Sequence, residues 1–205
     1  MLTATSRDYR NAKIESLHEA AHHHRIWCGN MTKLAESIAT EGVLVTLLVR
    51  ERPRAQGGYE IIDGVRRFRA ASKAGLKTLP IAVIDVDDLT AIQMQLEVNL
   101  EREGMHPMDE ALYFKDLTEL GMEPSAIAKR FGRKPREVTR RLALLGLSSR
   151  SRDAFAKGTI DEPAAMAMAT VDVHARQHDI LSAIAAGTMA TEDVPSYVAR
   201  GYQAP

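Results

Sequence analysis

The residues with the clearest chemistry are polar and basic side chains near the start of a predicted helix that begins at Pro135. The candidate DNA contacts are Arg133, Lys134, Arg136, Thr139 and Arg140. Arginine can donate two hydrogen bonds to the O6 and N7 atoms of guanine, and lysine can contact a phosphate or a base edge. The unpaired amide groups at a helix start also favour phosphate. These residue types at this spacing predict a surface that binds DNA.

Charge is unevenly distributed along a chain that is neutral overall, with 27 basic and 27 acidic residues. Residues 129–152 contain nine basic side chains and one acid, Glu137, for a net charge of +8. Residues 85–110 contain eight acids and one arginine, for a net charge of −7. The basic block indicates a polyanionic partner, although such blocks are also typical of solvated surface. The acidic block could dock the basic block of this chain or of a partner, and the sequence leaves both open.

Two short helices separated by Gly132 are predicted around the basic block. Pro124 suits the first turn of one helix, and Pro135 suits the first turn of the next. The residues expected to face inward are Ile127, Ala128 and Phe131 in the first helix, and Val138, Leu142 and Leu145 in the second. This pattern predicts a helix-turn-helix over residues 122–147, with its second helix in the major groove. An ordinary helical hairpin with a charged face is the alternative.

The elements that position these side chains fall into three segments. Residues 1–29 are predicted to be irregular, residues 30–104 to form an α/β domain, and residues 105–205 to form an all-helical domain. In the middle segment, strands are expected at 43–51, 59–63 and 79–86, and helices at 31–42, 65–75 and 87–102. Beyond a further helix at 106–121, the segment between the helix-turn-helix and about residue 200 predicts short helices separated by glycine and proline.

Composition excludes several classes of protein. The 205 residues are 45% hydrophobic, which is enough for a packed core. No apolar run is long enough to cross a membrane, and the first residues do not resemble a secretory signal. The single cysteine, Cys28, excludes an internal disulfide framework and favours the reducing cytoplasm. His22, His23 and His24 are not expected to bind a metal, because no second cluster of ligands accompanies them.

A glycine followed by arginines occurs a second time, in the sequence IIDGVRRFRAA. Gly64 lets backbone approach a ligand closely, and the helix start after it, with Arg66, Arg67 and Arg69, could hold phosphates. By itself this is a weak signal, because a glycine before a basic surface helix is common.

The order of motifs over residues 30–186 resembles the ParB family of bacterial chromosome and plasmid partition proteins. The segments that match are LAESIATEGVLVTLLV, the strand YEIID, the box that begins at Gly64, and VNLEREGMHPMDEA, with the helix-turn-helix at the expected distance after them. The last segment places Asn99, Leu100, Arg102, Pro107, Glu110 and Ala111 at positions that match the family. The resemblance implies a ParB- and sulfiredoxin-like small mixed sheet with helices, followed by a helical DNA-binding domain.

The same resemblance implies a DNA clamp controlled by CTP and magnesium, which loads on a centromere-like site. Gly64, Arg66 and Arg67 would contact the triphosphate, and Asn99 and Arg102 would lie beside it. The implied partners are double-stranded DNA, a second copy of the chain in a homodimer, and a ParA-type ATPase. The implied location is the cytoplasm, on the nucleoid or a plasmid, with no membrane partner.

Several positions depart from the family pattern. Val65 and Val98 stand where the family has acids, and valine cannot coordinate a hard cation. This argues against magnesium binding and leaves at most weak CTP hydrolysis. The family's proline-rich N-terminal box is replaced by AHHHRIWCG, and no leucine-rich dimerisation segment follows residue 186. We therefore expect a divergent or truncated member.

Two other functions remain open on the sequence. A plasmid-type transcriptional regulator would use the same helix-turn-helix with a degenerate nucleotide site, and Val65 and Val98 favour it. An enzyme is the third, because sulfiredoxin and some nucleases share the N-terminal fold of the family. It would need a reactive cysteine or metal-binding acids in the glycine-arginine box, which contains neither.

Overall fold

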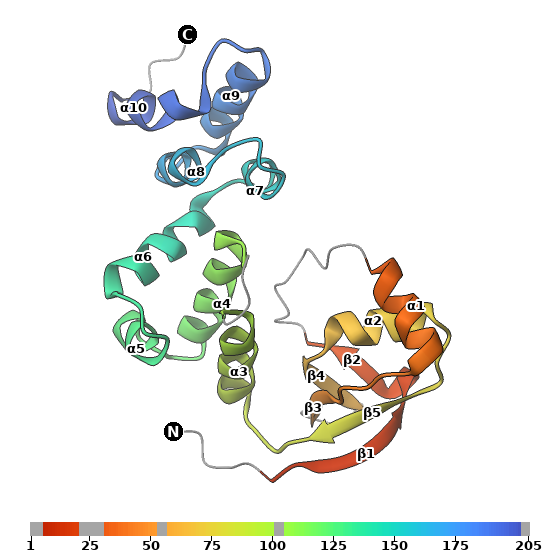
Figure 1. Ribbon diagram of the computed structural model, residues 1–205. Helices are drawn as coiled ribbons and strands as arrows, with labels where there is room; N and C mark the ends of the chain where they lie inside the picture. The colour runs from red at the N-terminus through yellow and green to blue at the C-terminus, as the bar shows by residue number, and fades with distance from the viewer. Residues whose placement is uncertain (1–5, 21–30, 53–56, 101–104, 202–205) are drawn as a thin grey trace. The chain divides into compact units, whose positions relative to one another are not determined.

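The computed structural model describes residues 6–20, 31–52, 57–100 and 105–201 (Figure 1). The chain divides into two compact units, 1–103 and 104–205, and each is described by itself. The first unit is a mixed sheet with helices and the second is helical, so the predicted fold class is confirmed. In the described part of the chain, no helix has the length and apolar character needed to cross a membrane.

The sheet of the first unit has five strands in the order β1-β5-β3-β4-β2. Their bounds are β1 Asp8–Lys13, β2 Leu17–Glu19, β3 Leu47–Glu51, β4 Tyr59–Asp63 and β5 Thr78–Val83, and a 3-10 helix, η1 (Ile14–Ser16), joins the first two. The pairs β1–β5 and β3–β4 are antiparallel, whereas β3–β5 and β2–β4 are parallel.

Alternate residues of the central strands face opposite sides of this sheet. Leu47 and Ile61 face one side and are fully buried in a core with α1 (Thr32–Glu41) and α2 (Val65–Lys73). Ile62, next to Ile61 in β4, faces the other side and packs against residues of α3 (Asp88–Leu100). Both faces are therefore covered, which explains why β3, β4 and β5 are apolar enough to be recognised in the sequence.

The expectation of an irregular segment over residues 1–29 is wrong for the described residues 8–19, which form β1, η1 and β2. Only Ala12 of β1 is buried, so this strand has no alternation of apolar and polar residues. It is a strand because its backbone pairs with β5 along six residues. The predicted strand over 43–51 begins only at Leu47, because the residues before it form a loop in which Leu44 is 79% exposed.

The second unit contains seven α-helices within the described residues 105–201. They are α4 (Pro107–Glu119), α5 (Pro124–Arg130), α6 (Pro135–Ala143), α7 (Ser149–Ala156), α8 (Glu162–Ala169), α9 (His174–Ala185) and α10 (Val194–Ala199), with 3-10 helices η2 (Leu144–Gly146) and η3 (Thr191–Asp193). Both α4 and α5 pack against α6, and Tyr113 and Leu117 of α4 are fully buried. Helices α7 to α10 form a second core around Ala164 and Met168.

Candidate nucleic-acid interface

The pair α5 and α6 has the local geometry predicted for a helix-turn-helix. Each helix has proline in its first turn. Gly132 has a φ of +63° in the turn, where the amide of Arg133 donates to the carbonyl oxygen of Ala128 at 2.8 Å. Ile127 and Val138 are fully buried, so the aliphatic sides of both helices face the core as predicted.

The prediction of which residues face inward is less accurate at the end of α6. Leu142 and Leu145 are only half-buried, whereas Leu144 is fully buried. The α-helix ends at Ala143 and continues as the 3-10 helix η2, which has fewer residues per turn. The change in turn moves Leu144 to the inside, so the i+7 spacing that selected Leu145 does not apply there.

The single acid of the basic block, Glu137, fixes the start of α6. Its Oε2 accepts a hydrogen bond from the backbone amide of Lys134 at 3.0 Å. This hydrogen bond is the main reason that the pKa of Glu137 lies below its ordinary value, and nearby Lys134, Arg133 and Arg136 lower the pKa further. Glu137 therefore stays ionised and caps the helix from which the candidate DNA contacts project.

The candidate DNA contacts lie on the exposed side of α6 or just before it. Lys134, Arg136, Thr139 and Arg140 are all exposed. Thr139 donates from its hydroxyl to the carbonyl oxygen of Pro135 at 3.2 Å. We find no ion pair for Arg136 among the described residues. These side chains are therefore exposed, with Val138 buried behind them, and their contact with DNA stays a prediction.

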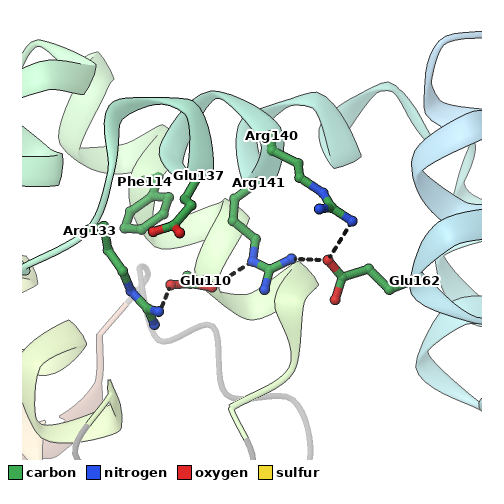
Figure 2. Close-up of a pocket in the computed structure, with 7 residues that line it drawn as sticks. All are labelled: Glu110, Phe114, Arg133, Glu137, Arg140, Arg141 and Glu162. Carbon is green, nitrogen blue, oxygen red and sulfur yellow. Dashed lines mark hydrogen bonds and ion pairs between the residues drawn. The ribbon is translucent and has the colours of Figure 1, made fainter.

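Three arginines and two glutamates form an ion network beside α6, and two of the arginines, Arg133 and Arg140, are also candidate DNA contacts (Figure 2). Glu110 of α4 binds Arg133 through Oε1 at 3.1 Å and Arg141 through Oε2 at 2.7 Å. Glu162 of α8 binds Arg141 at 2.5 Å and Arg140 at 3.4 Å, both through Oε1. Glu110, the last residue of the acidic block, therefore pairs with two arginines of the basic block in the same chain.

Burial within this network is graded. The side chain of Glu110 is 8% exposed and that of Arg141 is 24% exposed, whereas those of Arg133 and Arg140 are 42% and 56% exposed. Burial alone would lower the pKa of Arg141, but its hydrogen bonds to Glu110 and Glu162 outweigh burial and raise that pKa above its ordinary value. The five residues line a pocket of about 200 Å³ together with Phe114 and Glu137. Arg141 is the central cation of the network, and the two outer arginines face solvent.

The predicted nucleotide site begins where β4 meets α2. Gly64 has a φ of +106°, and a Cβ atom there would lie 2.9 Å from Cγ of Leu47 and 3.1 Å from Nη2 of Arg67. Only glycine fits both the backbone conformation and the space. Gly64 also stands at the cap position of α2 and makes no side-chain cap, so the first amides of the helix are left for other acceptors.

The two arginines of this segment are placed differently. Arg67 donates from Nη1 to the carbonyl oxygens of Val45 and Thr46, both at 2.7 Å, and from Nη2 to Asp63 at 2.8 Å. Nε of Arg66 is buried and has no hydrogen-bond partner among the described residues. Arg67 therefore ties the loop before β3 to the end of β4, and Arg66 retains an unused donor.

The other predicted nucleotide contacts come from a different element. Asn99 lies half-buried in the last turn of α3, the helix that packs on the opposite face of the sheet from α2. Arg102 lies outside the described residues. The structure thus brings Gly64, Arg66 and Arg67 together at one helix start.

The described residues do not fit a magnesium ion. Val65 is 4% exposed and belongs to the apolar core, and Val98 offers no oxygen. No group of three or more histidine, cysteine, aspartate or glutamate residues in the described ranges is arranged to hold a metal. His22, His23 and His24, like Cys28, lie outside those ranges.

Sequence reasoning missed the role of Arg141 and of its partners Glu110 and Glu162. A signal was present, because Arg141 follows Val138 by three residues and so lies on the inward side of α6. An arginine on an inward face predicts a buried acidic partner. The identity of that partner could not be read from the sequence, since Glu110 and Glu162 are 31 and 21 residues away.

Comparison with known proteins matches nearly the whole chain to two family models. Residues 3–100 match the model described as the ParB N-terminal domain, and residues 103–201 match the model described as the ParB HTH domain. The chromosome-partitioning protein Spo0J of Thermus thermophilus is 38% identical over 131 residues, 64% of this chain and 48% of that protein. A probable chromosome 1-partitioning protein ParB of Deinococcus radiodurans is 34% identical over 168 residues, 81% of this chain and 57% of that protein. The chain spans about half the length of these curated relatives.

Solved structures are also similar. The C-terminally truncated chromosome-partitioning protein ParB from Caulobacter crescentus, complexed to the centromeric parS site, matches with a TM-score of 0.55 and 26% identity, over 94% of this chain and 100% of that chain. The same truncated protein complexed with CTP-gamma-S is 32% identical and covers 85% of this chain and 99% of that chain. The TM-score of the second match, 0.44, is too low to compare the two folds.

Proposed function

The chain belongs to the ParB family, and from this we propose that it is a site-specific DNA-binding protein of the partition type, acting in plasmid or chromosome segregation. The observation that carries the proposal is the exposed basic side of α6. Arg136 and Arg140 project from α6 and Lys134 stands just before it, and the opposite side of the helix is anchored by the fully buried Val138. A helix anchored in this way can enter the major groove without losing its packing.

The contacts are assigned by side-chain chemistry. We expect Arg136 and Arg140 to read base edges or bind phosphate, and Thr139 to contact an adjacent base or phosphate. Arg133 and Lys134 precede the helix, so we expect them to bind the phosphate backbone next to its first amides.

The test is binding of the full chain to two short duplexes, one with a centromeric parS site and one with the same bases scrambled. We expect tighter binding to the parS duplex, with both affinities falling as salt rises. Lys157→Ala is the matched control, because Lys157 is exposed at the end of α7, outside the helix-turn-helix. Equal affinity for the two duplexes would contradict site-specific binding to this site.

We further propose that the first unit binds CTP at the start of α2. The unused donor of Arg66 and the uncapped amides after Gly64 support this assignment, because a triphosphate is a strong acceptor for such donors. Asn99 and Arg102 would lie beside it, as the family resemblance implies. We expect Arg67 to keep its bonds to Val45 and Thr46 and to shape the site from behind.

A bound CTP would add several negative charges and acceptor oxygens at this helix start. Magnesium is not part of the proposal, because Val65 and Val98 cannot bind it. We therefore expect CTP to bind without rapid hydrolysis, which would make the nucleotide a switch for closing two such units around DNA.

The alternative is a plasmid-type transcriptional regulator with a degenerate nucleotide site, and the burial of Val65 in the apolar core favours it. Calorimetry with CTP and measurement of released phosphate, each with and without the parS duplex, separate the two functions. Binding with little phosphate release supports the nucleotide switch. Absence of CTP binding in a protein that still prefers the parS duplex supports the regulator.

The partners and location follow from the same proposal. A homodimer is expected because a two-fold DNA site binds two copies of one helix more tightly than one. A ParA-type ATPase is the expected protein partner, and the nucleoid or a plasmid in the cytoplasm is the expected location. Sedimentation of the chain with and without the parS duplex tests the homodimer.

A further inference from the structure

We propose that Arg141 is a positioning residue that makes Arg133 and Arg140 available to DNA, by serving as the permanent cation of Glu110 and Glu162. The inference rests on the proposed function, since it concerns how that function uses α6. Arg141 is not among the expected DNA contacts, and its side chain is directed into the ion network instead of toward solvent (Figure 2).

The distances rank the arginines on each carboxylate. On Glu110, Arg141 is closer than Arg133, at 2.7 Å against 3.1 Å. On Glu162, Arg141 is again closer than Arg140, at 2.5 Å against 3.4 Å. Arg141 is also the most buried of the three cations, so its ion pairs are the least weakened by solvent. Each glutamate therefore has one strong partner in Arg141 and one weak, exposed partner.

This arrangement decides what happens when DNA draws an outer arginine away. Removing the only cation that pairs with a buried carboxylate strongly destabilises the folded protein. Glu110 would keep Arg141 when Arg133 leaves, and Glu162 would keep Arg141 when Arg140 leaves. Arg133 can therefore move to a phosphate without leaving the buried Glu110 unpaired, and Arg140 can move without leaving the partly exposed Glu162 unpaired.

Charge balance leads to the same conclusion. Among the ion-paired groups, three arginines share two glutamates, so the cations outnumber the paired carboxylates by one. Glu137 also lines the pocket but, within the described residues, forms no ion pair with these arginines. Without Arg141, two outer arginines would face two glutamates with no excess charge. Each outer arginine would then be the only network cation on its carboxylate, and DNA would have to compete with a glutamate for each of them.

The position of Arg141 on α6 suits this role. It projects from the inward side of the helix and reaches Glu110 on α4 and Glu162 on α8 at the same time. Two elements therefore hold the C-terminal half of α6 in place through one guanidinium group. A planar group with five donors can serve both carboxylates, which a lysine ammonium group does less well.

The test is the salt dependence of DNA binding by the full-length Arg141→Met variant, measured by fluorescence anisotropy with the scrambled duplex. Each phosphate contact adds about 0.9 to the slope of log affinity against log salt. Loss of two available arginines should lower the slope by about two, so the loss of affinity between roughly 50 and 200 mM salt becomes about tenfold smaller. Affinity at low salt should fall as well.

Neutralising the glutamates should reverse the effect. In the Arg141→Met/Glu110→Gln/Glu162→Gln variant, neither of the ion-paired carboxylates remains to compete for Arg133 and Arg140, so the wild-type slope should return. Arg141→Lys keeps the charge and should retain most of the slope. Arg141→Gln is a second neutral variant, which can still donate hydrogen bonds to the carboxylates should the methionine variant fold poorly.

The outcomes separate this inference from a purely structural role and from the proposed function. Partial unfolding would lower the amount of active protein and leave the slope of the remainder unchanged. An unchanged slope in a folded neutral variant, or no recovery in the triple variant, would overturn the inference. Failure of the wild-type chain to prefer the parS duplex would instead contradict the proposed function.

Discussion

Two regions of this protein place arginines after a glycine of positive φ, yet they use those arginines in opposite ways. In the first unit Gly64 precedes α2, and Arg67 donates three hydrogen bonds to the chain itself. In the second unit Gly132 precedes α6, and Arg136 is exposed without a described ion pair. The difference lies in what surrounds the helix start, since the residue types are the same.

The comparison teaches how to separate a structural arginine from a binding one. Arg67 lies within reach of two backbone carbonyls and a carboxylate, so its donors are already used. Arg133 and Arg140 are exposed to water on one side and share a carboxylate with Arg141 on the other. An arginine that shares its carboxylate with a better-placed cation can leave that carboxylate for a DNA phosphate or base. An arginine that donates to backbone carbonyls cannot leave without exposing unpaired carbonyl groups.

The largest expected effect is the loss of stability on replacing Arg67. Replacement by alanine would leave the carbonyls of Val45 and Thr46 and the Asp63 carboxylate without this donor, so the free energy of unfolding should fall by about 3 kcal/mol. Urea unfolding of the full chain, followed by amide exchange in the sheet, measures it. Arg136→Ala is the matched control and should change stability by less than about 0.5 kcal/mol. Similar losses for both variants would abolish the distinction between the regions.

The two glycines provide the next contrast. Gly64→Ala adds a Cβ atom 2.9 Å from Leu47 at a positive φ, so stability should fall by about 2 kcal/mol. Gly132 has the same sign of φ but no heavy atom within 4 Å of an added Cβ, so Gly132→Ala should cost about 1 kcal/mol. Thermal unfolding of the two variants measures the difference. A larger loss at Gly132 would show that the turn before α6 is the more constrained of the two.

DNA recognition should respond only to the second region. Arg136→Ala should reduce discrimination between the parS and scrambled duplexes by about 1–3 kcal/mol if Arg136 reads a base edge. Competition binding at fixed salt gives this value, with Lys157→Ala as the control. A smaller salt slope with unchanged discrimination would reassign Arg136 to a phosphate contact. Arg140→Ala should behave in the same way, with the same measurement.

The smallest expected effect concerns pH. His106 caps α4 by accepting a hydrogen bond on Nδ1 from the amide of Met108 at 3.1 Å, and its ring packs on Phe155. Burial lowers the pKa of His106 below its ordinary value of 6.5, and the nearby charge of Arg141 lowers it further. The unfolded chain therefore binds the proton first as pH falls. The contribution of His106 to stability is complete above about pH 6.5 and decreases as pH falls from there toward the folded-state pKa.

The measurement is the free energy of unfolding of the second unit between pH 8 and 5, followed by amide exchange. His106→Asn should remove this part of the pH dependence, because asparagine caps a helix without titrating, and His106→Ala should lose about 1 kcal/mol at neutral pH. In the first unit Asp87 caps α3, and hydrogen bonds from Thr90 lower its pKa below 3.8, so this cap stays ionised over the whole range. An equal pH dependence in wild type and His106→Asn would exclude His106 as the titrating cap.

Local sequence predicted the elements whose signal lies in their own residues. Strands β4 and β5 are apolar because they lie in the middle of a covered sheet, and the glycines and prolines around α5 and α6 mark where those helices begin and end. The exposed side of α6 followed from the burial of Val138 on the other side, since a helix has one fixed period. The family followed from the order of several such segments.

Tertiary structure decided the features that depend on distant residues. Strand β1 exists because its backbone pairs with β5, about 70 residues away, and its exposed side chains carry no signal of this pairing. Arg67 has a structural role because the loop before β3 brings the carbonyl oxygens of residues 45 and 46 within hydrogen-bond distance of its guanidinium group. Arg141 became the centre of the ion network because α4 and α8 bring two glutamates to one guanidinium group. Hydrogen bonds and ion pairs act only at contact distance, so their partners are known only once the chain has folded.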